Sequence, residues 1–379
     1  MLKKIAIPFL SISLIFSSCS TDFELNAPYE TIPVVYGLLD QSKDTQFVKI
    51  NRSFLGYGNN VDYAAINDCT HFENVVAVLE EYNEFGNLID HDTLKELMVG
   101  NLQPGIFYED SQKVYYLETD NDSLKEENTY HLKVSVPDKG LNFDAETDLI
   151  KGSWLNFKFQ TILYLAGSGF KVADVDLATT EDGYLEQTLR WTTAERGKRY
   201  ELMLRLRYTE VYNDLSEQEK YLEWNLGRQI SVSSSGGEEM FKDVSGGSFF
   251  NFVETQLQNY ENEDQVMKRV LGMDAIEIIL TAGNEDLNTY MQVNEPVTGI
   301  VTERPIFTNV NNGIGIFASK YSTRVSTFLS DGSMLEICAG QKTSGFKFCC
   351  DSANILPQNS ATQAVAISLL TGGVNVGCD

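Results

Sequence analysis

The chain has 379 residues, of which 42% are hydrophobic, and carries 54 acidic against 29 basic residues for a formal net charge of −25. Its length and apolar content suffice for two or three folded domains. The negative charge repels nucleic acid phosphates and anionic lipid headgroups, so we expect no nucleic acid partner.

Residues 1–18 have the pattern of a secretory signal peptide. Lys3 and Lys4 precede a short apolar run that ends at Phe16. A membrane-spanning helix needs about 20 apolar residues, so this run is too short to remain in a bilayer. We therefore predict that the leader is removed.

The end of the leader resembles a relaxed bacterial lipobox, Phe16-Ser17-Ser18-Cys19. An ordinary signal peptidase site would require a small residue where Phe16 stands. The resemblance implies that Cys19 is lipidated and that residues 19–30 form a tether; the alternative is a plain cut after Ser20. Each buried CH₂ contributes about 0.8 kcal/mol, so several acyl chains make a durable anchor.

The residues that follow Cys19 resemble the surface-export signal of Bacteroidota lipoproteins. They are Ser20, Thr21, Asp22, Phe23 and Glu24. Thr21 stands where that signal usually has an acidic residue, and a simple solvated linker is the alternative. The resemblance implies an outer-membrane protein that is anchored by lipid and exposed on the cell surface.

Residues 31–150 show the pattern of a β-sandwich. In the segment from Tyr130 to Val136, apolar residues alternate with polar ones, and the pattern returns from Leu141 to Ala145. Pro137-Asp138-Lys139-Gly140 lies between them and predicts a tight turn, because Pro presets φ and Gly accepts a positive φ. Strands at this spacing predict an immunoglobulin-like sandwich.

Residues 151–379 predict a second β-sandwich or barrel-like domain with inserted helices. We expect a long hairpin from Leu189–Thr193 and Tyr200–Tyr208, because the apolar residues recur with a period of two. Helical spacing predicts helices near 249–271 and 284–293, the second capped by Asn284. The fold class is therefore mostly β, with a cysteine-bearing C-terminal tail.

A short segment near the C-terminus resembles the signature of a family of Bacteroidota surface lipoproteins defined by a domain of unknown function. The matching residues are Asn309, Asn312, Gly313, Gly315 and Phe317. Members of that family have a lipobox and an immunoglobulin-like domain and are often encoded beside TonB-dependent transporters; the resemblance implies no catalytic residues. The residues themselves favour a structural role, since Asn-Gly forms turns and Gly permits close backbone approach.

Five cysteines remain once Cys19 is assigned to the anchor, and all are candidate disulfide residues. They are Cys69, Cys338, Cys349, Cys350 and Cys378. An odd number leaves at least one thiol unpaired if the others form two bridges. The sequence does not fix the pairing, and free buried thiols are the alternative.

No catalytic motif is recognisable in the sequence. The three histidines, His71, His91 and His131, lack the spacing of paired metal ligands. The Ser-Gly-Gly segments at 235–237 and 245–247 lack the lysine of a phosphate-binding loop. We expect no metal, no cofactor and no enzymatic activity. A surface enzyme that degrades glycans or peptides is the alternative, because a glycosidase needs only two carboxylates.

These features together predict a binding or accessory subunit of an outer-membrane β-barrel, which we expect to be a TonB-dependent nutrient transporter. A structural subunit of an outer-membrane assembly or secretion machine is the alternative. A glycan or peptide ligand would contact exposed aromatic side chains, although each of these could instead belong to a core. The candidates are Tyr57, Tyr63, Trp154, Tyr164 and Trp224. The partner surface is expected on loops of the second domain or on the tail.

Lipidation is directly testable on protein isolated from native membranes. We expect mass spectrometry to find an N-terminal peptide that begins at Cys19 and carries acyl chains on its sulfur and amine. An unmodified N-terminus at Thr21 would instead establish the plain signal-peptide cut.

Overall fold

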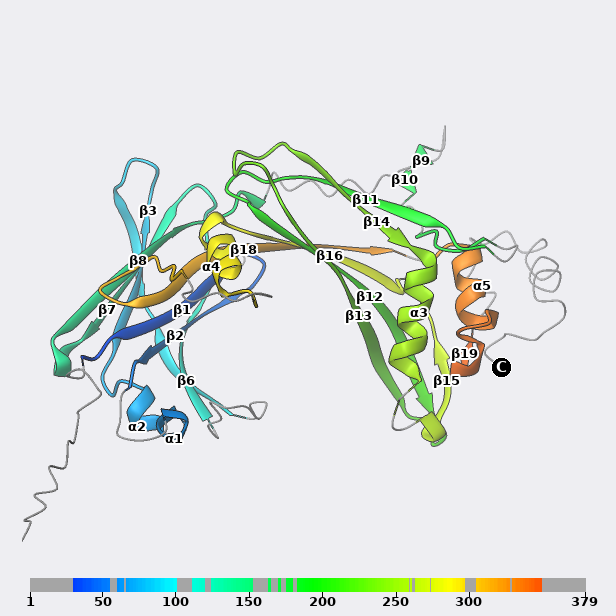
Figure 1. The fold of residues 1–379 in the computed structure, drawn as a ribbon, viewed down its shortest axis with the longest axis horizontal. Helices are drawn as coiled ribbons and strands as arrows, with labels where there is room; N and C mark the ends of the chain where they lie inside the picture. The colour runs from blue at the N-terminus through cyan, green and yellow to red at the C-terminus, as the bar shows by residue number, and fades with distance from the viewer. Residues whose placement is uncertain are drawn as a thin grey trace, which may run out of the picture.

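The computed structural model describes residues 30–54, 60–64, 66–100, 111–119, 124–152, 163–164, 170–171, 175–179, 183–258, 260, 263–272, 274–296, 305–327 and 329–349. The protein is mostly β, as the sequence predicts. Figure 1 shows two β-rich units, which we call the N-terminal unit (left) and the C-terminal unit (right), joined by strands that run between them.

Ten of the described strands form one sheet that extends through both units. Its order is β19-β15-β12-β16-β18-β1-β2-β6-β5, and β13 also pairs with β12. The strands are β1 (Pro33–Asp40), β2 (Thr45–Arg52), β5 (Lys95–Gly100), β6 (Ser111–Glu118), β12 (Arg199–Tyr212), β13 (Glu217–Ile230), β15 (Val266–Val270), β16 (Ile276–Gly283), β18 (Ile314–Thr327) and β19 (Phe348–Cys349).

The N-terminal unit is a sandwich of two sheets. Its second sheet has the order β17-β8-β7-β3-β4. These strands are β3 (Val76–Tyr82), β4 (Leu88–Thr93), β7 (Thr129–Val136), β8 (Leu141–Asp148) and β17 (Val310–Asn311). Val35, Ile50 and Tyr115 of the large sheet are buried against Leu132 and Phe143 of the smaller sheet. Two short helices, α1 (Asn60–Ala64) and α2 (Asn67–Thr70), follow β2.

The predicted hairpin of the N-terminal unit is confirmed. Strands β7 and β8 pair antiparallel from Thr129↔Asp148 to Val136↔Leu141. The turn between them is a single 3₁₀ turn, η1 (Pro137–Lys139), and Gly140 follows it with φ of 63°. The Pro-to-Gly turn and the alternation of apolar and polar residues in both strands together specify this register.

The C-terminal unit packs helices and a small sheet against the large sheet. Its further elements are β9 (Leu163–Tyr164), β10 (Phe170–Lys171), β11 (Glu186–Thr192), β14 (Glu239–Ser245), α3 (Gly246–Leu257), η3 (Glu263–Gln265), α5 (Asp331–Ala339) and η4 (Ser344–Phe346). Helix α4 (Glu285–Asn294) instead lies beside β18 and β1 in the N-terminal unit, where Tyr290 packs on Tyr36 with 6.4 Å between ring centroids. Its core joins Trp191 of β11, Leu204 of β12, Phe249 of α3, Ile278 of β16 and Ile337 of α5.

One strand, β18, belongs to both units. Its first half pairs in parallel with β1, from Val34↔Ile314 to Asp40↔Lys320. Its second half pairs antiparallel with β16, from Gly283↔Lys320 to Ile276↔Thr327. The segment 310–320 adds a strand to each sheet of the N-terminal sandwich, so this unit contains residues from both sides of position 150.

Hydrogen bonds fix the two units to each other where β8 ends. Ser319 Oγ donates to Asp148 O at 2.6 Å, and Asn284 Nδ2 donates to Thr147 Oγ1 at 3.0 Å. Arg196 of the C-terminal unit donates through Nη1 to Glu126 O at 2.9 Å. Each such bond contributes about 1 kcal/mol, so these hydrogen bonds stabilise the contact between the two units.

Two sequence-based predictions of the C-terminal unit are wrong. Strand β11 pairs with β14, and β12 pairs with β13 over its whole length, so 189–193 and 200–208 form no hairpin. The predicted helix over 249–271 ends at Leu257, and Val266–Val270 is a strand. The alternation and the apolar spacing identify buried faces, but pairing with a distant strand decides which element forms.

The predicted helix near 284–293 is confirmed as α4 (Glu285–Asn294). The Asn284 side chain caps it by accepting from Leu287 N at 3.0 Å. A further helix, α5, lies in the cysteine-bearing tail.

Gly315 should be intolerant of any side chain. Its φ is 118°, and a Cβ there would overlap with the carbonyl oxygen of Val35 on the paired strand. We expect Gly315→Ala to lower the free energy of unfolding by more than about 3 kcal/mol, measured by denaturant titration. Gly86→Ala is the matched control, because φ is 74° there but no atom lies within 4 Å; it should cost about 1 kcal/mol. Equal effects would show that the close contact with Val35 is unimportant.

Candidate functional site

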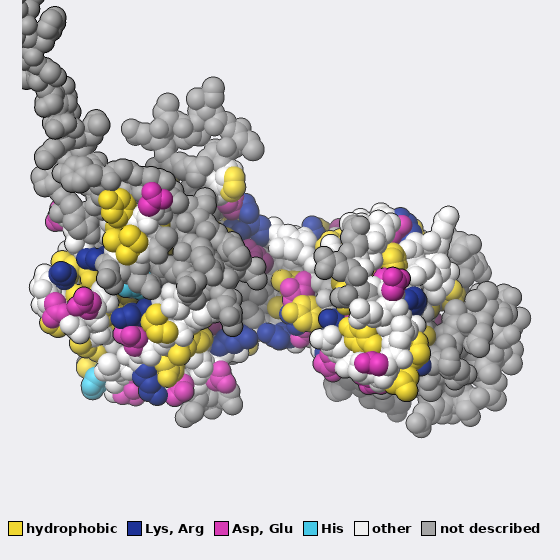
Figure 2. All heavy atoms as spheres, turned by 90° about the horizontal axis from the view of Figure 1, so that it is seen from below, with side chains coloured by type: hydrophobic (Ala, Val, Ile, Leu, Met, Phe, Trp, Pro, Cys, Tyr) yellow, Lys and Arg dark blue, Asp and Glu magenta, His cyan; other side chains and the backbone are white. Residues whose placement is uncertain are grey.

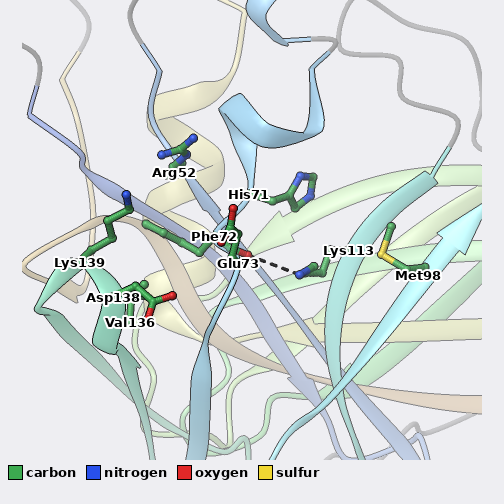
Figure 3. A pocket seen from close by; sticks show the side chains of 9 residues that line it. All are labelled: Arg52, His71, Phe72, Glu73, Met98, Lys113, Val136, Asp138 and Lys139. Carbon is green, nitrogen blue, oxygen red and sulfur yellow. Dashed lines mark hydrogen bonds between the residues drawn. The ribbon is translucent and has the colours of Figure 1, made fainter.

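A pocket of about 270 Å³ opens into the N-terminal unit between its two sheets. Phe72, Met98 and Val136 supply its apolar lining, and the remaining lining residues are polar or charged: Arg52, His71, Glu73, Lys113, Asp138 and Lys139. Figure 3 shows these side chains set around Phe72 and Glu73. Among the described cavities, this one combines an apolar interior with several charged groups, which is the usual composition of a ligand site.

Strand alternation and turns bring these residues together. Lys113 lies two residues before the buried Tyr115 on β6, so both side chains point into the sandwich. Met98 pairs directly with Lys113 across β5 and β6. Arg52 ends β2, whereas Asp138 and Lys139 come from the η1 turn. The pocket is therefore assembled from segments that are far apart in the sequence.

Backbone carbonyls orient the two innermost cations. Lys113 Nζ lies 3.4 Å from the carbonyl oxygen of Phe72 and 3.1 Å from Glu96 Oε2, and its side chain is only 16% exposed. Arg52 Nε donates to the carbonyl oxygen of Cys69 at 3.1 Å. The carbonyl bond fixes the direction of the guanidinium. The arrangement is suited to binding a polar ligand.

The signature residues have structural roles. The Asn309 amide brackets Phe317: Oδ1 accepts from Phe317 N at 2.9 Å, and Nδ2 donates to Phe317 O at 2.7 Å. Asn309 Nδ2 also donates to Asp286 Oδ2 at 3.0 Å, and burial raises the pKa of Asp286. These bonds stabilise the turn between β17 and β18.

The other signature residues lie in that turn or at the start of β18. Asn312 has φ of 56°, and a Cβ on Gly313 would lie 3.1 Å from the carbonyl oxygen of Pro33. The Phe317 ring is fully buried and occupies the space that the missing side chain of Gly37 leaves open. These contacts agree with the structural role that the residue types favour.

Cys338 and Cys349 each take part in a disulfide bond, whereas Cys69 is a free thiol. Cys19, the tract 20–24, Cys350 and Cys378 lie outside the described residues.

Of the aromatic candidates, Trp224 is partly buried against the core of the C-terminal unit and stacks on Phe252 with 5.7 Å between ring centroids. Tyr63 is half-buried beside α2. Tyr57, Trp154 and the side chain of Tyr164 lie outside the described residues.

Two of the three histidines occupy solvent-facing positions. His131 is partly exposed, lies 3.4 Å from Glu146 and packs on Tyr82. His91 is exposed on β4, and His71 lines the pocket. Within the described ranges, no three residues of the types His, Cys, Asp and Glu lie close enough to hold a metal ion.

The C-terminal unit contains a buried ion cluster that no sequence motif indicated. Arg269 of β15 and Glu210 of β12 are both 0% exposed, and Arg269 Nε donates to Glu210 Oε1 at 3.0 Å. Tyr212 and Tyr260 donate to Glu210 Oε2 at 2.8 and 2.7 Å. Burial, and next the Glu210 carboxylate, raise the pKa of Tyr260, so its phenol remains a donor.

The cluster also holds the disulfide-bearing segment. Arg269 Nη1 donates to the carbonyl oxygen of Phe346 at 2.6 Å, and Arg269 Nη2 lies 2.6 Å from Glu263. One signal in the sequence could have revealed the cluster. Glu210 occupies the apolar side of the alternation that runs through Leu206 and Tyr208, and a carboxylate there requires a buried cation.

No helix within the described residues is long and apolar enough to cross a membrane. No family model matches the sequence, and no curated protein is similar to it.

Two solved structures align with the chain at low similarity. The C-terminal globular domain of oligosaccharyltransferase from Pyrococcus abyssi has a TM-score of 0.24 and 8% identity, over 75% of this chain and 44% of that chain. Trypsin-activated alpha-2-macroglobulin from Escherichia coli has a TM-score of 0.16 and 9% identity, over 80% of this chain and 22% of that chain. The chain thus spans less than half the length of either protein. Superpositions this loose carry no argument about fold or function.

Removal of the Arg269 charge should destabilise the C-terminal unit severely. Arg269→Met would leave Glu210 buried without its cation, so we expect the free energy of unfolding to fall by about 3–5 kcal/mol. Arg207→Met is the control, since the ion pair of Arg207 with Asp274 is exposed and contributes at most about 1 kcal/mol. Denaturant titration of both variants measures the difference, and a similar small effect would contradict a structural role for the cluster.

Proposed function

We propose that this protein is a surface-exposed, lipid-anchored outer-membrane protein that acts as a binding or accessory subunit of an outer-membrane β-barrel, a TonB-dependent nutrient transporter. The observation that carries the proposal is an apolar outer sheet face on the N-terminal unit, close in sequence to the anchor site. The resemblance of the N-terminus to bacterial lipoproteins supplies the membrane attachment.

The outer face of β1, β2, β6 and β5 presents large apolar side chains to solvent. Tyr36 is 45% exposed, Phe47 is 49% exposed and Leu97 is 40% exposed. Phe47 pairs across the strands with Tyr116, and the ring centroids lie 6.4 Å apart. Figure 2 shows hydrophobic side chains among charged ones on one surface of the N-terminal unit. Lys49 and the exposed Lys95–Glu118 ion pair lie among these residues, and a surface that mixes exposed apolar and charged side chains suits a protein interface.

The tether keeps this face near the membrane. The chain from Cys19 to Pro33, where β1 begins, spans at most about 50 Å when fully extended. A lipid anchor confines the encounter with a barrel to the membrane plane, which raises the effective concentration without any added contact. We therefore propose the outer face of the N-terminal unit as a partner surface, in addition to the loops of the second domain and the tail.

The joint between the units favours a second candidate function. Because β18 passes without interruption from one unit to the other, the C-terminal unit is held in a fixed direction from the N-terminal unit. A C-terminal unit held in this way suits a structural subunit of an outer-membrane assembly. The two functions are distinguished by the barrel that is captured: a transporter supports the first, and a component of an assembly or secretion machine supports the second.

The outer face should be required for capture of the barrel. After cross-linking on intact cells, affinity purification of the wild-type protein should recover an outer-membrane β-barrel that mass spectrometry can identify. Phe47→Glu should reduce the recovery at least about fivefold, equivalent to about 1 kcal/mol, because it buries a charge in the interface. Phe85→Glu is the matched control, since Phe85 is also exposed on the N-terminal unit but lies in the β3–β4 turn.

Protease added to intact cells should degrade both variants, which checks that each is displayed on the surface. Equal recovery with both variants would remove the outer face from the interface. No barrel in any sample, together with hydrolysis of a glycan or peptide by the purified protein, would overturn the proposal.

A further inference from the structure

We propose that an open groove at the end of the C-terminal unit binds a neutral oligosaccharide. The groove lies where β12 turns into β13, beside the start of β15 (Figure 1), and its volume is about 480 Å³. That volume is within the usual range of ligand sites. The inference goes beyond the barrel partner proposed above, because the groove and the apolar outer face lie on different units.

Two tyrosines of the groove are held in place by the buried ion cluster. Tyr212 and Tyr260 line the groove, and both hydroxyls donate to the fully buried carboxylate of Glu210. Arg269 holds that carboxylate in turn. Because the hydroxyls are directed to Glu210, the aromatic rings are the parts of these residues that a ligand can contact. Rings that are ordered before binding lower the entropic cost of binding, and they offer an apolar surface to the C–H groups of a sugar.

The polar side chains of the groove keep hydrogen-bonding atoms that can serve a ligand. Asn213 Nδ2 donates to the carbonyl oxygen of Asp264 at 2.9 Å, which leaves Oδ1 as an acceptor. Gln218 Oε1 accepts from Tyr212 at 3.1 Å, which leaves Nε2 as a donor. Gln265 adds an exposed amide. Donors and acceptors in this mixture match sugar hydroxyls, because a hydroxyl group donates one hydrogen bond and accepts others.

The charges of the groove favour a neutral ligand. One carboxylate, that of Asp214, and one ammonium group, that of Lys220, line it, so neither sign is in excess. Hydrogen bonds from Ser216 lower the pKa of Asp214, and the carboxylate therefore stays ionised as an acceptor for hydroxyl groups. None of the described residues that line the groove is Val, Leu, Ile or Met. The groove thus lacks an apolar pocket for the side chains of a peptide, which makes a sugar the better fit.

Calorimetric titration of the purified full-length protein tests the assignment. The detergent must have no sugar headgroup, because such a headgroup would compete for the groove. Maltotriose, cellotriose and mannotriose are the neutral probes, and we expect at least one of them to bind saturably. Trigalacturonate, which is an anion, and the capped peptide N-acetyl-trialanine amide should bind at least about tenfold more weakly than that trisaccharide.

Two variants locate the binding at the groove. Gln218→Ala and Gln265→Ala each remove an exposed amide of the lining, and each should weaken the binding of that trisaccharide about fivefold, because one hydrogen bond is lost. Gln229→Ala is the matched control, since Gln229 lies near the other end of β13, where its Nε2 donates to the carbonyl oxygen of Phe241 at 2.6 Å. It should leave the affinity unchanged.

The proposal is wrong if none of the three trisaccharides binds saturably at millimolar concentration, or if trigalacturonate or the capped peptide binds as tightly as they do. An equal loss of affinity in Gln218→Ala and Gln229→Ala would place the binding outside the groove and would contradict the proposal as well. The comparison of probes needs no variant, so it decides the matter even if a variant fails to fold.

Discussion

The passage of β18 through both units is the constraint on which the rest of the structure depends. The strand pairs in parallel with β1 and antiparallel with β16. A parallel pair requires a crossover connection, and here that connection contains most of the chain. The sheet of the N-terminal unit is therefore incomplete until β18 arrives. Contacts between such distant segments close slowly, so we infer that the two units fold together and not as independent domains.

Close packing around small residues makes the shared strand possible. Gly315 brings the β18 backbone against Val35, and Gly37 leaves space for the Phe317 ring. Asn309 satisfies both backbone groups of Phe317 where no neighbouring strand does so. Further along β18, the ring of Tyr321 packs on Gly152. The short motif that resembles a family signature thus has a physical meaning, because it forms the turn between β17 in the smaller sheet and β18 in the large sheet.

Local features of the fold could be predicted from the sequence, whereas long-range pairing could not. The β7–β8 turn and the Asn284 cap depend on residues a few positions apart, and both predictions are confirmed. The partner of β12 lies further along the chain, and alternation alone does not identify it. The pocket escaped prediction for the same reason, since Arg52, Lys113 and Lys139 come from separate strands and turns. Individually, each resembles an ordinary surface cation.

The distribution of charge separates the roles of the two units. On the C-terminal unit, Arg205 of β12 lies 2.6 Å from Glu223 of β13 and 2.5 Å from Glu277 of β16. Arg324 of β18 extends this row at 3.7 Å from Glu277. A row of alternating charges across four strands keeps that sheet face hydrated and opposes docking of an apolar surface. The N-terminal unit has Tyr36 and Phe47 at the corresponding outward positions of the same sheet. One continuous sheet therefore presents a row of alternating charges on the C-terminal unit and, on the N-terminal unit, exposed apolar side chains beside the Lys95–Glu118 ion pair.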